Sequence, residues 1–468
     1  MNAPRAVVNG EPALAEAVEP MPPAPAPRRA APLVQVFVCL LLGCQVALLI
    51  PGIAPLRMFV RTAAFGLSLL LLAAVRGRGR RHPAFLPALL VAGVLLLALA
   101  SPMTVNLAAG GAQAGLYVAV LAPIFWVSRL SPDIRAVRQT AMIMWVFHSA
   151  SALLGVLQVY FPGHFQPPIS TIILSKGPGY LNSLMITTAS GVRVFRPMGL
   201  TDIPGGSSVS ALYAVLFGTG FFLTRRTPWM MAASAASMAV GFTCLYLSQV
   251  RSVLLMTGIT LAVIVAVLAW RRDLPRLAML GGAALTVVLG GYTLAMAIAG
   301  PTVARRMATL TASQPGAVYY NERGRFFSDA INKTLPQAPL GTGLGHWGMT
   351  AAYFGSGDDP YVTWVEIQWA GWIVDGGAPL ALLYCVTVFV ALLAAWNVAR
   401  GRAPPDAPDL PFWGTVVLAH GIGAFALTFS FPLFVSQPGM EFWLLNAALL
   451  AAARPPRPRT SPFQQRLL

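Results

Sequence analysis

The sequence contains few charged residues. Only 10% of its 468 residues are Asp, Glu, Lys or Arg, whereas an ordinary soluble domain carries about 25%. Hydrophobic residues make up 56%, and the mean hydropathy is +0.68. These values exclude an ordinary soluble domain and indicate a polytopic membrane protein. Because irregular backbone exposed to lipid leaves polar groups unsatisfied, we predict an all-α fold whose helices cross the bilayer.

Cysteine and acidic residues are also scarce. The four cysteines lie within apolar segments and have no paired spacing, which argues against a disulfide framework or a zinc site. Only 15 acidic residues oppose 32 basic ones, which gives a net charge of +17. The basic residues form short clusters between apolar segments, so we interpret them as a topology signal and expect no nucleic-acid partner. We also expect no cofactor and no metal.

Twelve apolar segments are long enough to be predicted membrane spans. Their approximate ranges are 33–50, 56–75, 84–101, 110–128, 139–160, 204–223, 229–247, 252–270, 277–299, 378–398, 412–434 and 439–453. Most Lys and Arg residues fall on the cytoplasmic side if the N-terminus is inside, which places both termini in the cytoplasm.

These spans divide the chain into five parts. Residues 1–32, rich in Pro and Ala, are predicted to form a disordered cytoplasmic tail. Residues 33–300 hold spans one to nine, and 378–453 hold spans ten to twelve. A large periplasmic loop is predicted between them, at 301–377, and a basic cytoplasmic tail at 454–468.

The predicted loop at 301–377 concentrates polar and aromatic residues that the rest of the chain lacks. It contains the motifs Asn321-Glu-Arg-Gly-Arg325, Gly341-Thr-Gly-Leu-Gly-His-Trp-Gly348 and Tyr361-Val-Thr-Trp-Val-Glu366. Loops of this length are usually functional or disordered, and we interpret this one as the catalytic loop. The glycine run lacks the Lys-Ser or Lys-Thr of a phosphate loop, so it predicts a tight turn.

Several arginines remain on the predicted outer side despite the charge bias. Arg193 and Arg196 precede the span at 204–223, and Arg251 opens the span at 252–270. Both spans begin outside, so their free N–H groups and guanidinium groups would meet at one membrane level, as in an anion site. The alternative is that each arginine extends to the lipid head groups.

The order and placement of these motifs resemble the O-antigen ligase and O-antigen polymerase superfamily of polytopic membrane glycosyltransferases. The resemblance covers about residues 140–400 and rests on Arg196-Pro-Met-Gly-Leu-Thr-Asp-Ile-Pro-Gly205, Ser248-Gln-Val-Arg-Ser252, and Arg323 before Pro339-Leu-Gly-Thr-Gly-Leu-Gly345. It implies a multi-pass protein of the bacterial inner membrane with a periplasmic active site.

The resemblance also implies the substrates. The donor would be an undecaprenyl-diphosphate-linked oligosaccharide, and the acceptor a glycan or the lipid A core, with inverting, metal-independent transfer. Membrane lipids and other polysaccharide-assembly proteins are expected partners. Carried over by position, the residues that hold the diphosphate are Arg196, Arg251 and Arg323, with Arg325 and Arg193 as close substitutes.

The catalytic base does not follow directly from the family. The position of the family's His falls on Glu366, which would either accept the acceptor proton or pair with a loop arginine. His346, in the glycine-rich turn, is the rival base. Trp364, Trp369 and Trp372 are either a sugar-stacking platform or interfacial anchors.

Three classes of function remain open at this point. Within the first, the missing family His favours a polymerase of exopolysaccharide or O-antigen repeat units over a ligase that joins glycan to the lipid A core. The second class is a polysaccharide or lipid transporter, and the third is a non-catalytic membrane subunit.

Asp358 and Asp359 are either divalent-ion ligands or a solvated turn, and the turn is the preferred interpretation.

Overall fold

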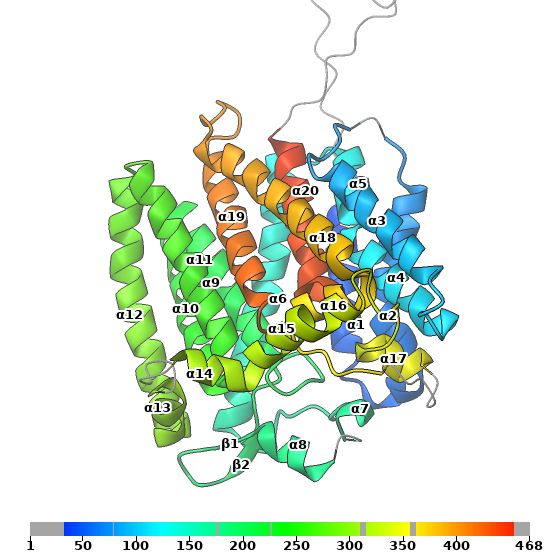
Figure 1. The fold of residues 1–468 in the computed structure, drawn as a ribbon. Helices are drawn as coiled ribbons and strands as arrows, with labels where there is room; N and C mark the ends of the chain where they lie inside the picture. Colours follow the sequence, from blue (N-terminus) through cyan, green and yellow to red (C-terminus); the bar gives the residue numbers. More distant parts are fainter. Residues whose placement is uncertain are drawn as a thin grey trace, which may run out of the picture.

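The computed structural model describes residues 32–77, 79–174, 177–224, 227–308, 315–355 and 362–453. These residues form a bundle of roughly aligned helices (Figure 1). The strands in this part of the chain are β1 (Met185–Thr187) and β2 (Arg193–Phe195), which form one short antiparallel hairpin. The prediction of an all-α fold is therefore confirmed for the described residues.

Nine helical segments of the described chain are long and apolar enough to cross a membrane. They are α2 (Arg57–Ala74), α4 with α5 (Leu107–Leu121 and Pro123–Leu130), α6 (Ile134–Tyr160), α9 (Ser207–Thr224), α10 (Pro228–Ser248), α11 (Arg251–Trp270), α12 (Leu274–Ala299), α18 (Gln368–Arg400) and α19 (Leu410–Leu427). The remaining predicted spans coincide with shorter helices: α1 (Leu33–Ala47), α3 (Phe85–Leu99) and α20 (Gln437–Ala452). The chain has the helices of a membrane protein, while a count of twelve crossings stays a prediction.

The short elements gather toward one end of the bundle, in the lower half of Figure 1, which we call the loop end. They are α7 (Thr171–Leu174), α8 (Pro178–Ser183), the hairpin, α13 (Pro301–Ala308), α14 (Pro315–Tyr319), α15 (Arg325–Asp329), α16 (Leu335–Gln337) and α17 (Gly348–Phe354). All of these come from residues 161–203 and 301–377, the two segments that the sequence predicts to lie outside. That the loop end faces the periplasm remains a prediction.

Helix α18 begins earlier than the sequence predicted. Its first turns, from Gln368, belong to the segment assigned to the loop, and the helix is broken at Gly376 and Gly377. Gly377 has φ 62°, and a Cβ there would lie 2.0 Å from the Pro339 carbonyl oxygen. The Ala378 N–H donates to that carbonyl (2.9 Å). The break is therefore held by a second segment of chain, which no pattern within α18 reveals.

The glycine-rich segment at 341–348 forms the predicted turn and lies between the start of α4 and the break in α18. Thr342 N–H donates to the Val374 carbonyl just before the break in α18 (2.8 Å), and Leu344 N–H donates to Thr104 Oγ1 (3.0 Å). Gly345 has φ 88°, and a Cβ at this position would lie 2.6 Å from the backbone of α4. Close backbone approach explains the glycines here, as expected for a turn.

The orientation can be tested with single cysteines at the two ends of the bundle. Gln337 is exposed at the loop end, and Ala403 is exposed in the connection between α18 and α19 at the opposite end. In a background with the four native cysteines replaced, we expect an impermeant thiol reagent to label Gln337→Cys in intact spheroplasts. Ala403→Cys should react only after lysis, and its labelling in intact spheroplasts would contradict a periplasmic loop end.

Candidate functional site

Arg196 is positioned by the β-hairpin at the loop end. Its backbone N–H extends the hairpin by donating to the Leu184 carbonyl (2.9 Å), and its Nη2 donates to the Ser183 carbonyl (3.0 Å). Gly205, with φ 83°, turns the chain back so that its N–H reaches the Arg196 carbonyl (3.4 Å). The side chain is therefore fixed at the start of α9.

Arg251 and Arg306 come from two further elements at the same end. Arg251 is the first residue of α11 and follows Gln249, whose φ of 55° turns the chain sharply out of α10. Arg306 lies on α13, which follows α12 after Gly300. Both guanidinium groups pair with Glu322; the Arg306 Nη1 to Glu322 Oε1 distance is 3.9 Å.

Glu322 and Arg323 lie in a helical stretch that contains two π-helical turns. The stretch runs from α14 through the π turn at Tyr320–Gly324, α15 and a second π turn at Ala330–Thr334 to α16. Such turns are rare and often occur at functional sites. Glu322 faces Arg251 and Arg306, whereas Arg323 pairs with Glu366 in the extended segment before α18. This stretch thereby links α11 and α13 to the base candidate.

These contacts assemble a site that we call the basic cluster, composed of Arg196, Arg251, Arg306, Arg323, Glu322 and Glu366. Its six described members contain four guanidinium groups and two carboxylates, an excess of positive charge. The structure thus brings together the three arginines that the sequence predicted to hold diphosphate, Arg196, Arg251 and Arg323.

The electrostatics of the cluster reflect this crowding. Burial lowers the pKa of Arg196, and the charges of Arg306 and Arg251 lower it further. Burial also lowers the pKa of Arg306, again with the help of Arg251. The pKa of Glu322 is lowered; burial alone would raise it, but the hydrogen bond and charge of Arg251, with the charges of Arg306 and Arg323, outweigh burial. Closely spaced guanidinium groups of this kind favour a multiply charged anion.

Two predicted diphosphate ligands lie outside the basic cluster. Arg193 is exposed, and its Nη2 lies 3.4 Å from Asn182 Oδ1 of α8. Arg325 is exposed, and its guanidinium carbon lies 5.2 Å from the ring centre of Phe326. Neither contact involves a member of the basic cluster.

The three tryptophans occupy different environments. Trp364 is 52% exposed and donates from Nε1 to Glu366 Oε1 (2.5 Å). Trp369 is half-buried against Phe327 of α15, with ring centres 5.8 Å apart, and donates to Thr428 Oγ1. Trp372 is fully buried and stacks on Tyr384 (4.9 Å). Trp372 therefore belongs to the bundle core, and a shared sugar platform of all three is wrong; Trp364 is the exposed one beside Glu366.

His346 is buried in the glycine-rich turn. It is 1% exposed, and its Nε2 lies 3.0 Å from the Met103 carbonyl oxygen. The surrounding turn is anchored by a carboxylate that the sequence pattern did not reveal. Asp375 accepts hydrogen bonds from Gln113 Nε2 (3.1 Å), Tyr117 Oη (2.8 Å) and Trp347 Nε1 (2.9 Å). This geometry favours a structural role for His346.

Comparison with protein families and with curated proteins finds no match to this chain. The resemblance to O-antigen ligases and polymerases therefore rests on the motifs and their placement, and it stays a hypothesis. Asp358 and Asp359, the pair considered as divalent-ion ligands, lie outside the described residues.

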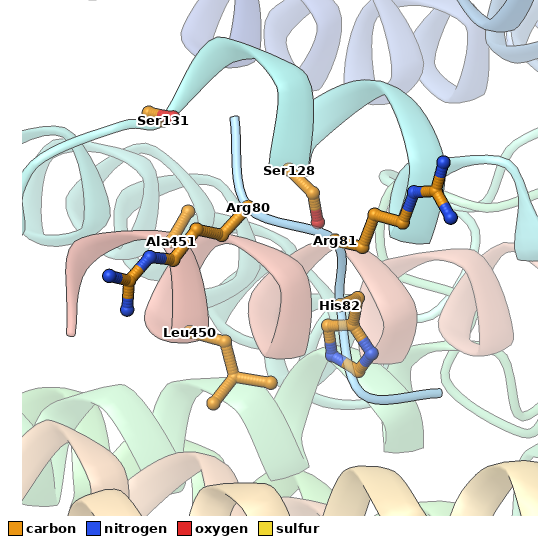
Figure 2. A pocket seen from close by; sticks show the side chains of 7 residues that line it. All are labelled: Arg80, Arg81, His82, Ser128, Ser131, Leu450 and Ala451. Carbon is orange, nitrogen blue, oxygen red and sulfur yellow. The ribbon is translucent and has the colours of Figure 1, made fainter. Parts of the chain in front are cut away.

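A small pocket at the opposite end of the bundle is too small for a sugar substrate. Figure 2 shows its lining residues, Arg80, Arg81, His82, Ser128, Ser131, Leu450 and Ala451. The side chains of Arg80 and Arg81 point away from each other, and Arg81 lies over the Phe85 ring (5.0 Å). The cavity has a volume of about 10 Å³, room for one water molecule.

Arg306 and Glu322 are the members of the basic cluster that the sequence did not single out. Arg306 follows Arg305 in a short helix, and Glu322 precedes Arg323 within a motif that is distinguished by its arginines. Their charge is visible in the sequence, but the partner that each one faces depends on the helical phase. The π turn at Tyr320–Gly324 directs Glu322 toward Arg251 and Arg306 and the adjacent Arg323 toward Glu366.

Proposed function

We propose that this protein is a membrane glycosyltransferase that moves a glycan from a polyprenyl-diphosphate donor to an acceptor hydroxyl at the loop end. The observation that carries the proposal is the convergence of Arg196, Arg251, Arg306 and Arg323 from four separate elements. Guanidinium groups suit a diphosphate because each can donate two parallel hydrogen bonds to it. The beginning of α11 adds backbone N–H groups and a positive dipole end.

The carboxylates of the cluster have a role in this proposal. Glu322 and Glu366 neutralise Arg251 and Arg323, the same groups that would bind the diphosphate. Donor binding would compete with Glu366 for Arg323 and so release a carboxylate beside the acceptor. Coupling of this kind would restrict general-base catalysis to the donor complex.

The reaction follows from these roles. Glu366 removes the proton of the acceptor hydroxyl while the hydroxyl oxygen forms a bond to the anomeric carbon of the donor sugar. The bond from that carbon to the diphosphate oxygen breaks on the opposite face, so the configuration inverts. The polyprenyl diphosphate leaves with its developing negative charge held by the arginines.

Polymerisation of exopolysaccharide or O-antigen repeat units is the preferred form of this activity, and ligation to the lipid A core is the alternative. Both use the same donor chemistry and differ in the acceptor. Deletion of the gene followed by glycan analysis separates them. Loss of secreted polymer, or core bearing single repeats, supports a polymerase; uncapped lipid A core supports a ligase. Unchanged glycans on every carrier would contradict both.

Lysine replacements test the diphosphate contacts directly. Arg251→Lys and Arg323→Lys keep the charge but lose the two parallel donors, and hydrogen bonds to charged groups are worth about 1.5–3 kcal/mol. We expect each variant to lower transfer from a purified lipid-linked donor by roughly tenfold or more. The matched control is Arg325→Lys, in the same helical stretch but outside the cluster, which should keep normal transfer. Full activity in both cluster variants would show that charge alone suffices.

A further inference from the structure

A second group of buried ionisable side chains lies within the bundle and takes no part in the basic cluster. Its central residue is Glu441, on α20, whose side chain is 1% exposed. Gln437 Nε2 donates to Glu441 Oε1 (2.9 Å), and the same amide also donates to Gln45 Oε1 of α1 (3.2 Å). Glu441 Oε2 has no hydrogen-bond partner among the described residues. Glu441 takes part in none of the ion pairs found among the described residues.

Two further elements bring polar side chains to the same place. The hydroxyl of Tyr213, on α9, lies beside the Glu441 carboxyl without completing a hydrogen bond of good geometry. The ring of His420, on α19, lies 5.3 Å from the Tyr213 ring, and its Nδ1 has no partner in the described chain. His148, on α6, stacks on Tyr213 with ring centres 4.6 Å apart. Four helices thus contribute to one buried polar group.

A cavity of about 10 Å³ adjoins this group. Tyr213 and His420 are its polar lining residues, and the other walls are apolar: Val209, Leu212, Met256, Leu427, Phe431, Leu433 and Pro438. This volume is about the minimum for one water molecule, which needs at least two polar partners. The surface that the lining residues present to the cavity is apolar, so it offers a water molecule no polar partner and leaves Glu441 Oε2 and His420 Nδ1 unsatisfied.

The charge state of Glu441 follows from its surroundings. A buried carboxylate without a counter-cation is strongly disfavoured relative to its neutral form. The group nearest Oε1 is the N–H of an amide, which repels a metal cation, so a proton is the fitting partner. A protonated carboxyl would donate to Tyr213, whose own hydroxyl would then be available to donate onward toward His420.

We propose that Glu441, Tyr213 and His420 form a buried proton-binding site, in which the Glu441 carboxyl holds an exchangeable proton. The ionisable groups that face it are Tyr213 from α9, His420 from α19 and, through Tyr213, His148 from α6; Tyr384 of α18 lies one contact further, beside Trp443. Loss of the proton at high pH would place an unpaired charge between α9, α19 and α20 and loosen their packing. The site makes no use of the basic cluster, so it stands whether or not the protein transfers glycans.

Infrared difference spectroscopy of the purified full-length protein tests this assignment. Glu441→Gln is expected to remove the carbonyl band of a protonated carboxylic acid at neutral pH, and that band should shift when water is exchanged for heavy water. Asp375→Asn removes another buried carboxyl of the bundle and serves as the matched control, which should leave the Glu441 band in place. Loss of an ionised carboxylate band in Glu441→Gln would overturn the proposal.

Two measurements guard against a variant that fails to fold. Tyr213→Phe removes one oxygen atom and should shift the frequency of the same band by removing its hydrogen-bond acceptor. In the wild-type protein, the unfolding temperature should fall as the pH rises through the value at which the band disappears. A band unchanged by Tyr213→Phe, or unfolding that does not follow its loss, would exclude a proton site built from these residues.

Discussion

Glu366→Gln is expected to lower the rate of glycan transfer by about 100- to 10,000-fold, the usual effect of removing a general base. The substitution keeps the size of the side chain. Its amide oxygen can still accept from Arg323 or from Trp364 Nε1, which are the two contacts that fix Glu366 in the structure. Folding and donor binding should therefore survive while proton removal fails.

The ion pair with Arg323 fits two roles for Glu366, that of the catalytic base and that of a structural partner, and this variant separates them. A structural partner would act through stability: Glu366→Gln would lower protein abundance or the unfolding temperature, and the surviving molecules would work normally. Transfer must therefore be measured per folded molecule, from a purified lipid-linked donor. Near-normal turnover on that basis would eliminate Glu366 as the base.

Two matched variants complete the experiment. Asp329→Asn removes an exposed carboxylate of the same helical stretch that pairs with Lys333, and it should leave transfer unchanged. His346→Ala should mainly weaken the glycine-rich turn, because the imidazole contacts the Met103 carbonyl and lies buried. Collapse of turnover in folded His346→Ala would instead move the base to His346.

Asp375→Ala is expected to destabilise the bundle by about 3 kcal/mol or more, since each buried donor left unpaired costs roughly 1–3 kcal/mol. Three donors lose their acceptor in this variant: Gln113, Tyr117 and Trp347. Asp375→Asn keeps one acceptor oxygen and should have a smaller effect. Asp375→Ala should therefore be less stable than Asp375→Asn, because it leaves more donors unpaired.

Thermal unfolding in detergent and amide hydrogen exchange measure this effect. Exchange should rise first in the glycine-rich turn and around the break in α18, because Trp347 and Asp375 join these segments. Asp406→Ala, at an exposed position between α18 and α19, provides the control and should leave both measurements unchanged. Equal stability of Asp375→Ala and the wild-type protein would mean that water satisfies the three donors.

Predicting helices from apolar segments succeeded because lipid and helix geometry act locally. A run of apolar residues defines a helix wherever its neighbours lie, and each of the twelve predicted spans has a helix in the structure. The predicted boundary near Gly377 coincides with the place where α18 is broken, although α18 also includes a short helical part before it, from Gln368. The two glycines mark a break inside α18, which is held by Pro339 and Thr342 from a distant part of the chain.

The sequence by itself determined the all-α fold, the segments that form the loop end, and three arginines of the basic cluster, because hydropathy and charge are properties of single residues and short runs. Only the tertiary structure decided which side chains meet. The pairing of Arg323 with Glu366, the inclusion of Arg306 and Glu322, and the burial of Trp372 depend on helical phase and on contacts between distant segments. The same holds for Asp375 and Glu441. In the sequence each is a single carboxylate within an apolar run, and only the packing of the helices decides which polar groups surround it.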